Sequence, residues 1–142
     1  MDNKKRSWAL SAFLISATPF IATEALAAGG LDGSSNMVCA VIDVVACVDD
    51  KACTQGTARS FDLPQFMIFD SEKKVMRATD ESGHNAVSPI KNIERSGEQL
   101  ILQGVENGRG WNIAIDTKAG TMSGSVVGDA VSMLVFGNCT TL

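Results

Sequence analysis

Four cysteines are the residues whose number and spacing point most directly to a chemistry. Cys39, Cys47, Cys53 and Cys139 are separated by seven, five and 85 residues, so none of them forms the C-x-x-C pair that is typical of a zinc site. An even number of cysteines in an exported chain predicts two disulfides instead. The spacing therefore predicts covalent cross-links and no metal centre.

The pairing of these cysteines follows from a predicted strand at residues 37–48. Cys39 and Cys47 share one face of that strand but lie about 26 Å apart in extended chain, whereas a disulfide needs Cα atoms roughly 4.4–6.8 Å apart. We therefore expect Cys47 to pair with Cys53 across a short turn. Of the two connectivities that remain, we favour the one that also pairs Cys39 with Cys139, which would tie the first strand to the last.

No other group of residues forms a catalytic or binding motif. The single histidine, His84, stands in a predicted turn, where a solvated side chain is expected. Ser123-Gly124-Ser125 lacks the spacing of a nucleophile elbow. Several aspartates lack the spacing of a calcium loop and are expected to be solvated: Asp43, Asp49, Asp50, Asp62 and Asp70. We predict no catalytic residue, no metal site and no cofactor.

The start of the chain has the order of a secretory signal peptide. Lys4, Lys5 and Arg6 precede an apolar run from Trp8 to Ala22, and Ala25-Leu26-Ala27 follows. The run is too short for a membrane span. We therefore predict a signal peptide at 1–27, a flexible Gly/Ser-rich leader at 28–36 and a single β domain at 37–142, in a periplasmic or secreted protein with no membrane span after cleavage.

The charge of the predicted mature chain argues against nucleic acid as a partner. Removing residues 1–27 takes three basic and two acidic residues from the 12 and 16 of the whole chain, which leaves 9 and 14 and a net charge of −5. A phosphate backbone would be repelled by that balance.

The mature part of the chain alternates apolar and polar residues with the period of a β-strand and has no helical stripe. The predicted strands are Met37–Val48, Arg59–Asp62, Phe66–Asp70, Lys73–Thr79, Ala86–Glu94, Gln99–Glu106, Arg109–Asp116, Thr121–Val127 and Ala130–Phe136. Asn107-Gly108 is the preferred pair for a two-residue type I′ turn. That turn would place Gly104 opposite Trp111, and Leu102 opposite Ile113, on one apolar face.

The next two turns continue the same apolar face. A four-residue loop at 117–120 places Trp111 opposite Val126. A type II′ turn at Gly128-Asp129 places Val126 opposite Val131 and puts Cys139 on the inner side. The agreement of these turns with the Cys39–Cys139 bridge predicts a small antiparallel up-and-down barrel or sandwich of about eight strands, stapled by disulfides.

Trp111, the one tryptophan of the mature chain, has two interpretations. We expect it to be buried in the core over Gly104, because the register demands an inward side chain. The alternative is an aromatic binding platform, with Phe61, Phe66, Phe69 and Phe136 helping to line a cavity.

Several short stretches resemble small uncharacterised exported proteins of Gram-negative bacteria. They are Asp62-Leu63-Pro64, Ser88-Pro89-Ile90, residues 100–104, Gly110-Trp111 and residues 135–140. The resemblance implies export to a bacterial periplasm and supplies no established activity and no catalytic residue.

These observations favour a non-catalytic binding or accessory protein whose partner is an unknown small molecule or protein. A secreted inhibitor or protein-interaction module is the alternative, and an enzyme built from carboxylates alone comes third. A carrier would need an interior cavity, an inhibitor a protruding loop without one, and such an enzyme two acids facing each other across a cleft.

Overall fold

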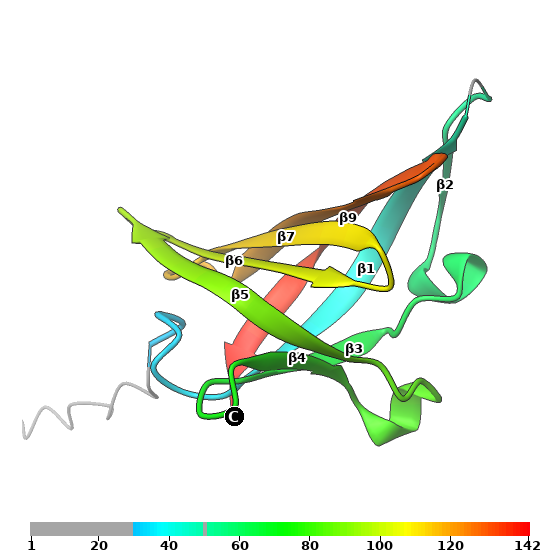
Figure 1. Ribbon diagram of the computed structural model, residues 1–142. Coiled ribbons are helices and arrows are strands. Elements are labelled where there is room, and N and C mark those ends of the chain that lie inside the picture. The colour runs from blue at the N-terminus through cyan, green and yellow to red at the C-terminus, as the bar shows by residue number, and fades with distance from the viewer. Residues whose placement is uncertain (1–29, 50) are drawn as a thin grey trace, which may run out of the picture.

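The computed structural model describes residues 30–49 and 51–142, so the predicted signal peptide lies outside the described part. This part consists of nine strands and two short 3₁₀ helices (Figure 1). They are β1 (Met37–Val48), β2 (Thr54–Gly56), η1 (Ala58–Phe61), β3 (Phe66–Asp70), β4 (Val75–Ala78), η2 (Asp80–Ser82), β5 (Val87–Ser96), β6 (Gln99–Glu106), β7 (Arg109–Asp116), β8 (Thr121–Gly128) and β9 (Val131–Thr141).

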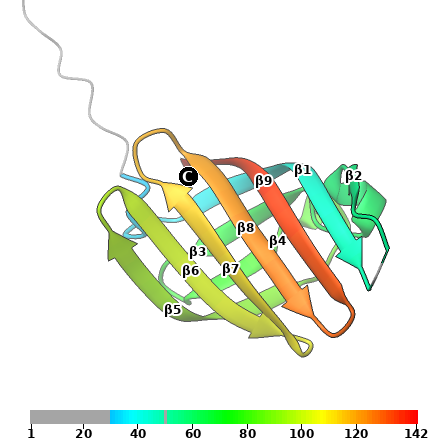
Figure 2. The same cartoon turned by 90° about the horizontal axis from the view of Figure 1, so that it is seen from above.

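Eight of the strands form a closed antiparallel barrel, as one of the two predicted architectures requires. Each strand from β3 to β9 pairs with its neighbour in the chain, β1 pairs with β3, and β1 also pairs with β9 to close the sheet. β2 pairs with the second half of β1, beyond the part that pairs with β3, and is an extra strand outside the barrel. Figure 2 shows β5 to β9 and β1 side by side, with β3 and β4 behind them. Closure limits the unpaired edges to the short β2 and to the second half of β5, which pairs with β6 alone.

The predicted hairpin registers of β6, β7 and β8 are confirmed. Gly104 pairs with Trp111, and Leu102 pairs with Ile113. Trp111 pairs in turn with Val126 on β8. The inward residues of these strands belong to one core, in which Leu100, Leu102 and Ile115 are fully buried. Alternation with period two has therefore placed one face of each of these strands inside the barrel.

The predicted turn between β8 and β9 is wrong by one position. Gly128 pairs with Val131, so the loop is Asp129-Ala130 rather than Gly128-Asp129. Ala130 takes the left-handed conformation (φ 61°), and its carbonyl accepts a hydrogen bond from Asp49 N–H. The register moves by two residues, so Val126 faces Met133 instead of Val131 and both side chains keep their inward direction.

The predicted strand Arg59–Asp62 is also wrong, because this segment forms η1. The chain leaves β2 on the outside of the sheet and must turn inward to begin β3, so no neighbouring strand is in reach. Its backbone groups bond locally instead: Leu63 N–H donates to the carbonyl of Ala58, and Asp62 takes a left-handed conformation (φ 54°). β2 itself was not predicted.

Both predicted disulfides are present. Cys39 and Cys139 are direct partners in the β1–β9 ladder, with Cα atoms 4.0 Å apart, so the bridge joins the two strands that close the barrel. Cys47 and Cys53 join β1 to the residue before β2, with a sequence separation of 6. The predicted shared face of Cys39 and Cys47 is wrong, because a β-bulge between Val41 and Asp43 shifts the alternation and places Cys47 on the other face. Two disulfides are typical of a chain that folds in an oxidising compartment. In the part that the structure describes, no helix is long and apolar enough to cross a membrane.

The leader, predicted to be flexible, makes contacts with one end of the barrel from residue 31 on. Leu31 is partly buried against the core, and Gly33 lies against the side chain of Leu100. The Asn36 side chain accepts hydrogen bonds from the backbone and hydroxyl of Ser71. We call this the closed end; it comprises residues 30–36, the β3–β4 and β5–β6 turns and the β7–β8 loop.

Candidate functional site

A cavity of about 240 Å³ opens at the other end of the barrel. We call this the open end; it comprises residues 57–65, the β4–β5 connection and the turns after β6 and β8. The walls are mainly apolar side chains from six strands and from the segment after η1: Val41, Leu63, Met67, Met76, Ile113, Val126 and Val135. Small-molecule sites have such apolar walls and volumes of roughly 300–1,000 Å³, so this cavity lies just below the usual size.

Trp111 forms one wall of this cavity rather than a filled part of the core. Its indole lies over Gly104, where a Cβ atom would come within 2.2 Å of Cζ2. The indole N–H donates a hydrogen bond of 2.7 Å to the hydroxyl of Ser88, a buried residue on β5. The ring therefore spans the inner wall from β7 across β6 to β5, and it is half-buried instead of buried. The predicted contact with Gly104 is present, whereas the predicted burial is incomplete.

Charged side chains gather at the rim of the cavity. They are Asp62, Arg77, Glu106 and Arg109, and His84 lies beside them. Glu106 and Arg109 are direct cross-strand partners at the end of the β6–β7 hairpin, yet among the described residues the ion pairs are only Lys73–Asp70 and Lys118–Glu98. The rim therefore offers charges of both signs that are not neutralised by each other.

The position of the Arg109 side chain explains why this pair does not form. A Cβ atom on Gly128 would lie 2.7 Å from Cγ of Arg109 and 3.4 Å from its Cδ. The arginine thus extends over β8, on the side of β7 away from Glu106. Gly128 supplies the space for this side chain, and Glu106 stays at the mouth without an arginine partner.

The structure places the other candidate residues in different regions. His84, expected to be a solvated turn residue, is half-buried at the rim, and Asp62 is exposed there. Asp70, which was expected to be solvated, is instead buried at the closed end, where it accepts a hydrogen bond from Lys73 N–H. Within residues 30–49 and 51–142, no three His, Cys, Asp or Glu side chains form a group that could hold a metal ion.

The four phenylalanines proposed as cavity lining do not line it. Phe69 is fully buried in the core, Phe61 packs against the core from η1, and Phe66 and Phe136 are exposed on the outer surface. The cavity therefore has Trp111 as its aromatic wall. Sequence reasoning missed Met67, Met76 and Leu63, whose contribution depends on how the chain enters β3.

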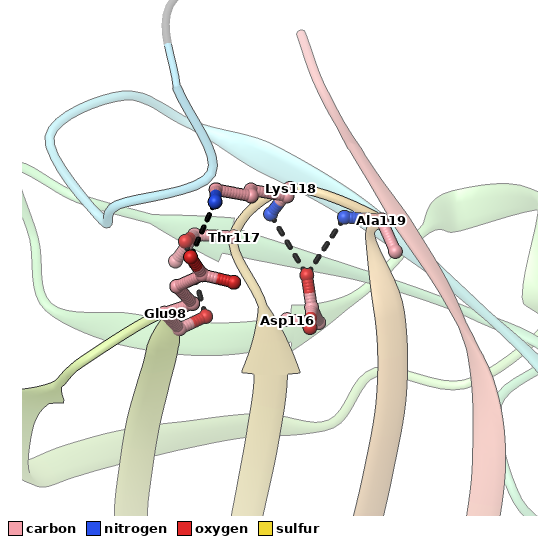
Figure 3. A network of polar contacts seen from close by, with 5 residues as sticks. All are labelled: Glu98, Asp116, Thr117, Lys118 and Ala119. Atoms are coloured by element: carbon pink, nitrogen blue, oxygen red, sulfur yellow. Dashed lines mark hydrogen bonds and ion pairs between the residues drawn. The ribbon is translucent and has the colours of Figure 1, made fainter.

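The closed end has a different set of polar contacts (Figure 3). The Asp116 carboxylate accepts hydrogen bonds from the backbone N–H groups of Lys118 and Ala119, and these bonds lower its pKa. Lys118 Nζ is paired with Glu98, and the Thr117 hydroxyl donates to the Glu98 carbonyl. This network fastens the β7–β8 loop to the β5–β6 turn.

Comparison of the chain with family models, with curated proteins and with solved structures gives no match in any of the three. The interpretation of the cavity therefore depends on its geometry and chemistry.

Proposed function

We propose that this protein binds a small, largely apolar molecule in the open-end cavity and acts as a non-catalytic binding or accessory protein of the periplasm or the extracellular space. The observation that carries the proposal is the cavity itself, because a carrier requires interior space and a closed eight-stranded barrel can provide it. The signal-like start of the chain and its two disulfides support export.

The size of the cavity limits the ligand. A volume of about 240 Å³ lies just below the roughly 300–1,000 Å³ of typical ligand sites, so the ligand must be small. A single-ring compound with a short polar chain fits this space, whereas a long acyl chain or a polycyclic ligand would extend out of it. The half-buried indole of Trp111 provides a flat apolar surface for such a ring.

A matched pair of variants tests the proposal. Val126 lines the cavity, and the next residue, Val127, is 52% exposed on the outer face of β8. Binding of 2-phenylethanol to the mature, oxidised protein should be measured by calorimetry and by Trp111 fluorescence. Val126→Phe should abolish binding by filling the cavity, whereas Val127→Phe should leave it unchanged. Equal binding by both variants, or no binding by the unmodified protein, would argue against this site.

A secreted protein-interaction module is the second candidate, and one observation favours it. Leu134 and Phe136 are 49% and 43% exposed on the outer face of β9 and form a small apolar surface. Co-purification of mature protein from a bacterial periplasm tests this role. A protein partner that is lost in the Leu134→Ser variant and kept in Val126→Phe would favour interaction through the outer face.

A further inference from the structure

We infer that the ligand of the cavity is a small organic ammonium ion with an apolar substituent, held between the indole of Trp111 and the carboxylate of Glu106. This inference rests on the proposed function and specifies the chemical class of the ligand.

The first observation is the direction of the indole. Its contact with Gly104 and its hydrogen bond to Ser88 hold the ring flat against the inner wall of the barrel. One face is covered by the backbone of β6, so the opposite face is turned towards the cavity that Trp111 lines. The face of an indole attracts a cation within about 6 Å of its centre, and tryptophan is the strongest of the aromatic side chains in this respect.

The second observation is the location of Glu106. It is the last residue of β6 and shares the inward parity of Leu102 and Gly104, so it lies two residues, about 7 Å, beyond the glycine that the indole covers. The half-buried Glu106 carboxylate forms no ion pair with a described residue, since Arg109 extends over Gly128 instead. An acceptor and an aromatic face are therefore adjacent, and a protein cation does not neutralise the acceptor.

The charges at the rim balance each other, and the net charge of the chain favours a cation. Two acidic residues, Asp62 and Glu106, line the mouth together with two arginines. Arg77 alternates with the buried Met76 and Ala78, so its side chain starts from the outer face of β4. Arg109 lies over β8. The predicted mature chain carries a net charge of −5, which would attract a cation to the mouth and repel an anion.

Three probes of similar size and different charge test the inference by calorimetry on the mature, oxidised protein. They are 2-phenylethylammonium, 2-phenylethanol and 3-phenylpropionate. We expect the ammonium compound to bind about tenfold more tightly than the alcohol, and the carboxylate to bind most weakly. Raising the salt concentration should weaken the binding of the ammonium compound and leave the alcohol unaffected.

Two variants test whether the preference for a positively charged ligand depends on Glu106. Glu106→Gln should lower the affinity for the ammonium compound about tenfold and leave the affinity for the alcohol unchanged. Glu94→Gln changes the same charge on an exposed residue of β5 away from the cavity and should change neither affinity. Equal affinity for the ammonium compound and the alcohol, or an effect of Glu94→Gln as large as that of Glu106→Gln, would overturn the inference and leave the proposed function intact. Failure of all three probes to bind would count against the proposed function as well.

Discussion

The two ends of the barrel are built from the same strands but carry different kinds of contact. At the closed end, the chain before β1 packs Leu31 against the core, and the Cys39–Cys139 bridge and the Asp116 loop hold the neighbouring strands together. At the open end, the inward side chains stop short of filling the barrel, and a cavity of about 240 Å³ remains behind a rim of charges. In Figure 1 the leader lies at the left and the two 3₁₀ helices at the right.

This difference shows how one small sheet can be tightly packed and cross-linked at one end and still surround a cavity at the other. The long ladders β1–β9, β6–β7 and β8–β9 run from one end of the barrel to the other, so cross-links and packing at the closed end stabilise the same ladders that surround the cavity. The open end can then keep a half-buried tryptophan and unpaired charges. The predictions below change one end at a time.

The largest expected effect comes from the covalent bridge beside the closed end. Cys39 and Cys139 close a loop with a sequence separation of 100, whereas Cys47 and Cys53 close one with a separation of 6. In the chain-entropy model these bridges stabilise the fold by about 4.7 and about 2.4 kcal/mol. The double variant Cys39→Ala/Cys139→Ala should therefore lose more stability to urea than Cys47→Ala/Cys53→Ala. Equal losses would mean that the longer bridge is not the main constraint on the unfolded chain.

Next in size is an overpacking effect at the open end. A valine at position 104 would place its Cβ 2.2 Å from the indole and 2.7 Å from the carbonyl of Pro89. Gly104→Val should cost about 1–3 kcal/mol in the free energy of unfolding and shift the Trp111 fluorescence maximum. Gly110, in the same hairpin, has open space around its Cα, so Gly110→Val is the matched control. A Gly104 variant as stable as that control would contradict the position of the indole.

A smaller effect is expected when the closed end loses its apolar contact with the leader. Leu31 is only partly buried, so Leu31→Ala should cost about 1 kcal/mol, below the range for a fully buried leucine. Binding of 2-phenylethanol to the open end should be unchanged, because the cavity and Leu31 lie at opposite ends. If the variant lost more binding than its lower stability can account for, the leader would also shape the cavity.

The smallest expected effect is a loss of folding stability at low pH. Three carboxylates of the closed end, Asp32, Asp70 and Asp116, have lowered pKa values, caused chiefly by hydrogen bonds from Ser34, Lys73 and Ala119 respectively. A carboxylate whose pKa is lower in the folded state stabilises that state above its ordinary pKa of 3.8, and this stability is lost as the pH falls through the folded value. The midpoint of thermal unfolding should therefore fall as the pH drops below about 4.

Asp116→Asn should reduce this acid-induced decrease, because the variant has no carboxylate to protonate in the β7–β8 loop. Asp129→Asn removes the same charge from the β8–β9 turn at the open end and serves as the control. If both variants showed the same pH dependence, the loop at the closed end would not be its source.

Much of the fold could be predicted from local chemistry. Asn107-Gly108 fixed one turn, and the strict alternation from Leu100 to Ile115 fixed which side chains point inward. The same parity identified Cys139 as a partner for Cys39. The register of β8 and β9 could not be derived in this way, because the left-handed residue of their turn is Ala130, which has no special preference for that conformation.

The site was harder to predict than the fold. Trp111 was recognised as an inward residue, but a cavity is the volume that side chains from distant strands leave unfilled. Met67 and Met76 come from β3 and β4, which lie across the barrel from Trp111, and Leu63 follows η1, which was taken for a strand. His84 reached the rim through the β4–β5 connection, whose path sequence periodicity does not describe.

The most direct test of the difference between the two ends is a chemical-shift titration of the mature protein with 2-phenylethanol. We expect the Trp111 indole N–H and the methyl groups of Met76 and Val126 to shift, while those of Leu31, Leu100 and Met122 at the closed end stay in place. Shifts spread over the outer faces of the strands or concentrated at the closed end would contradict a ligand site at the open end.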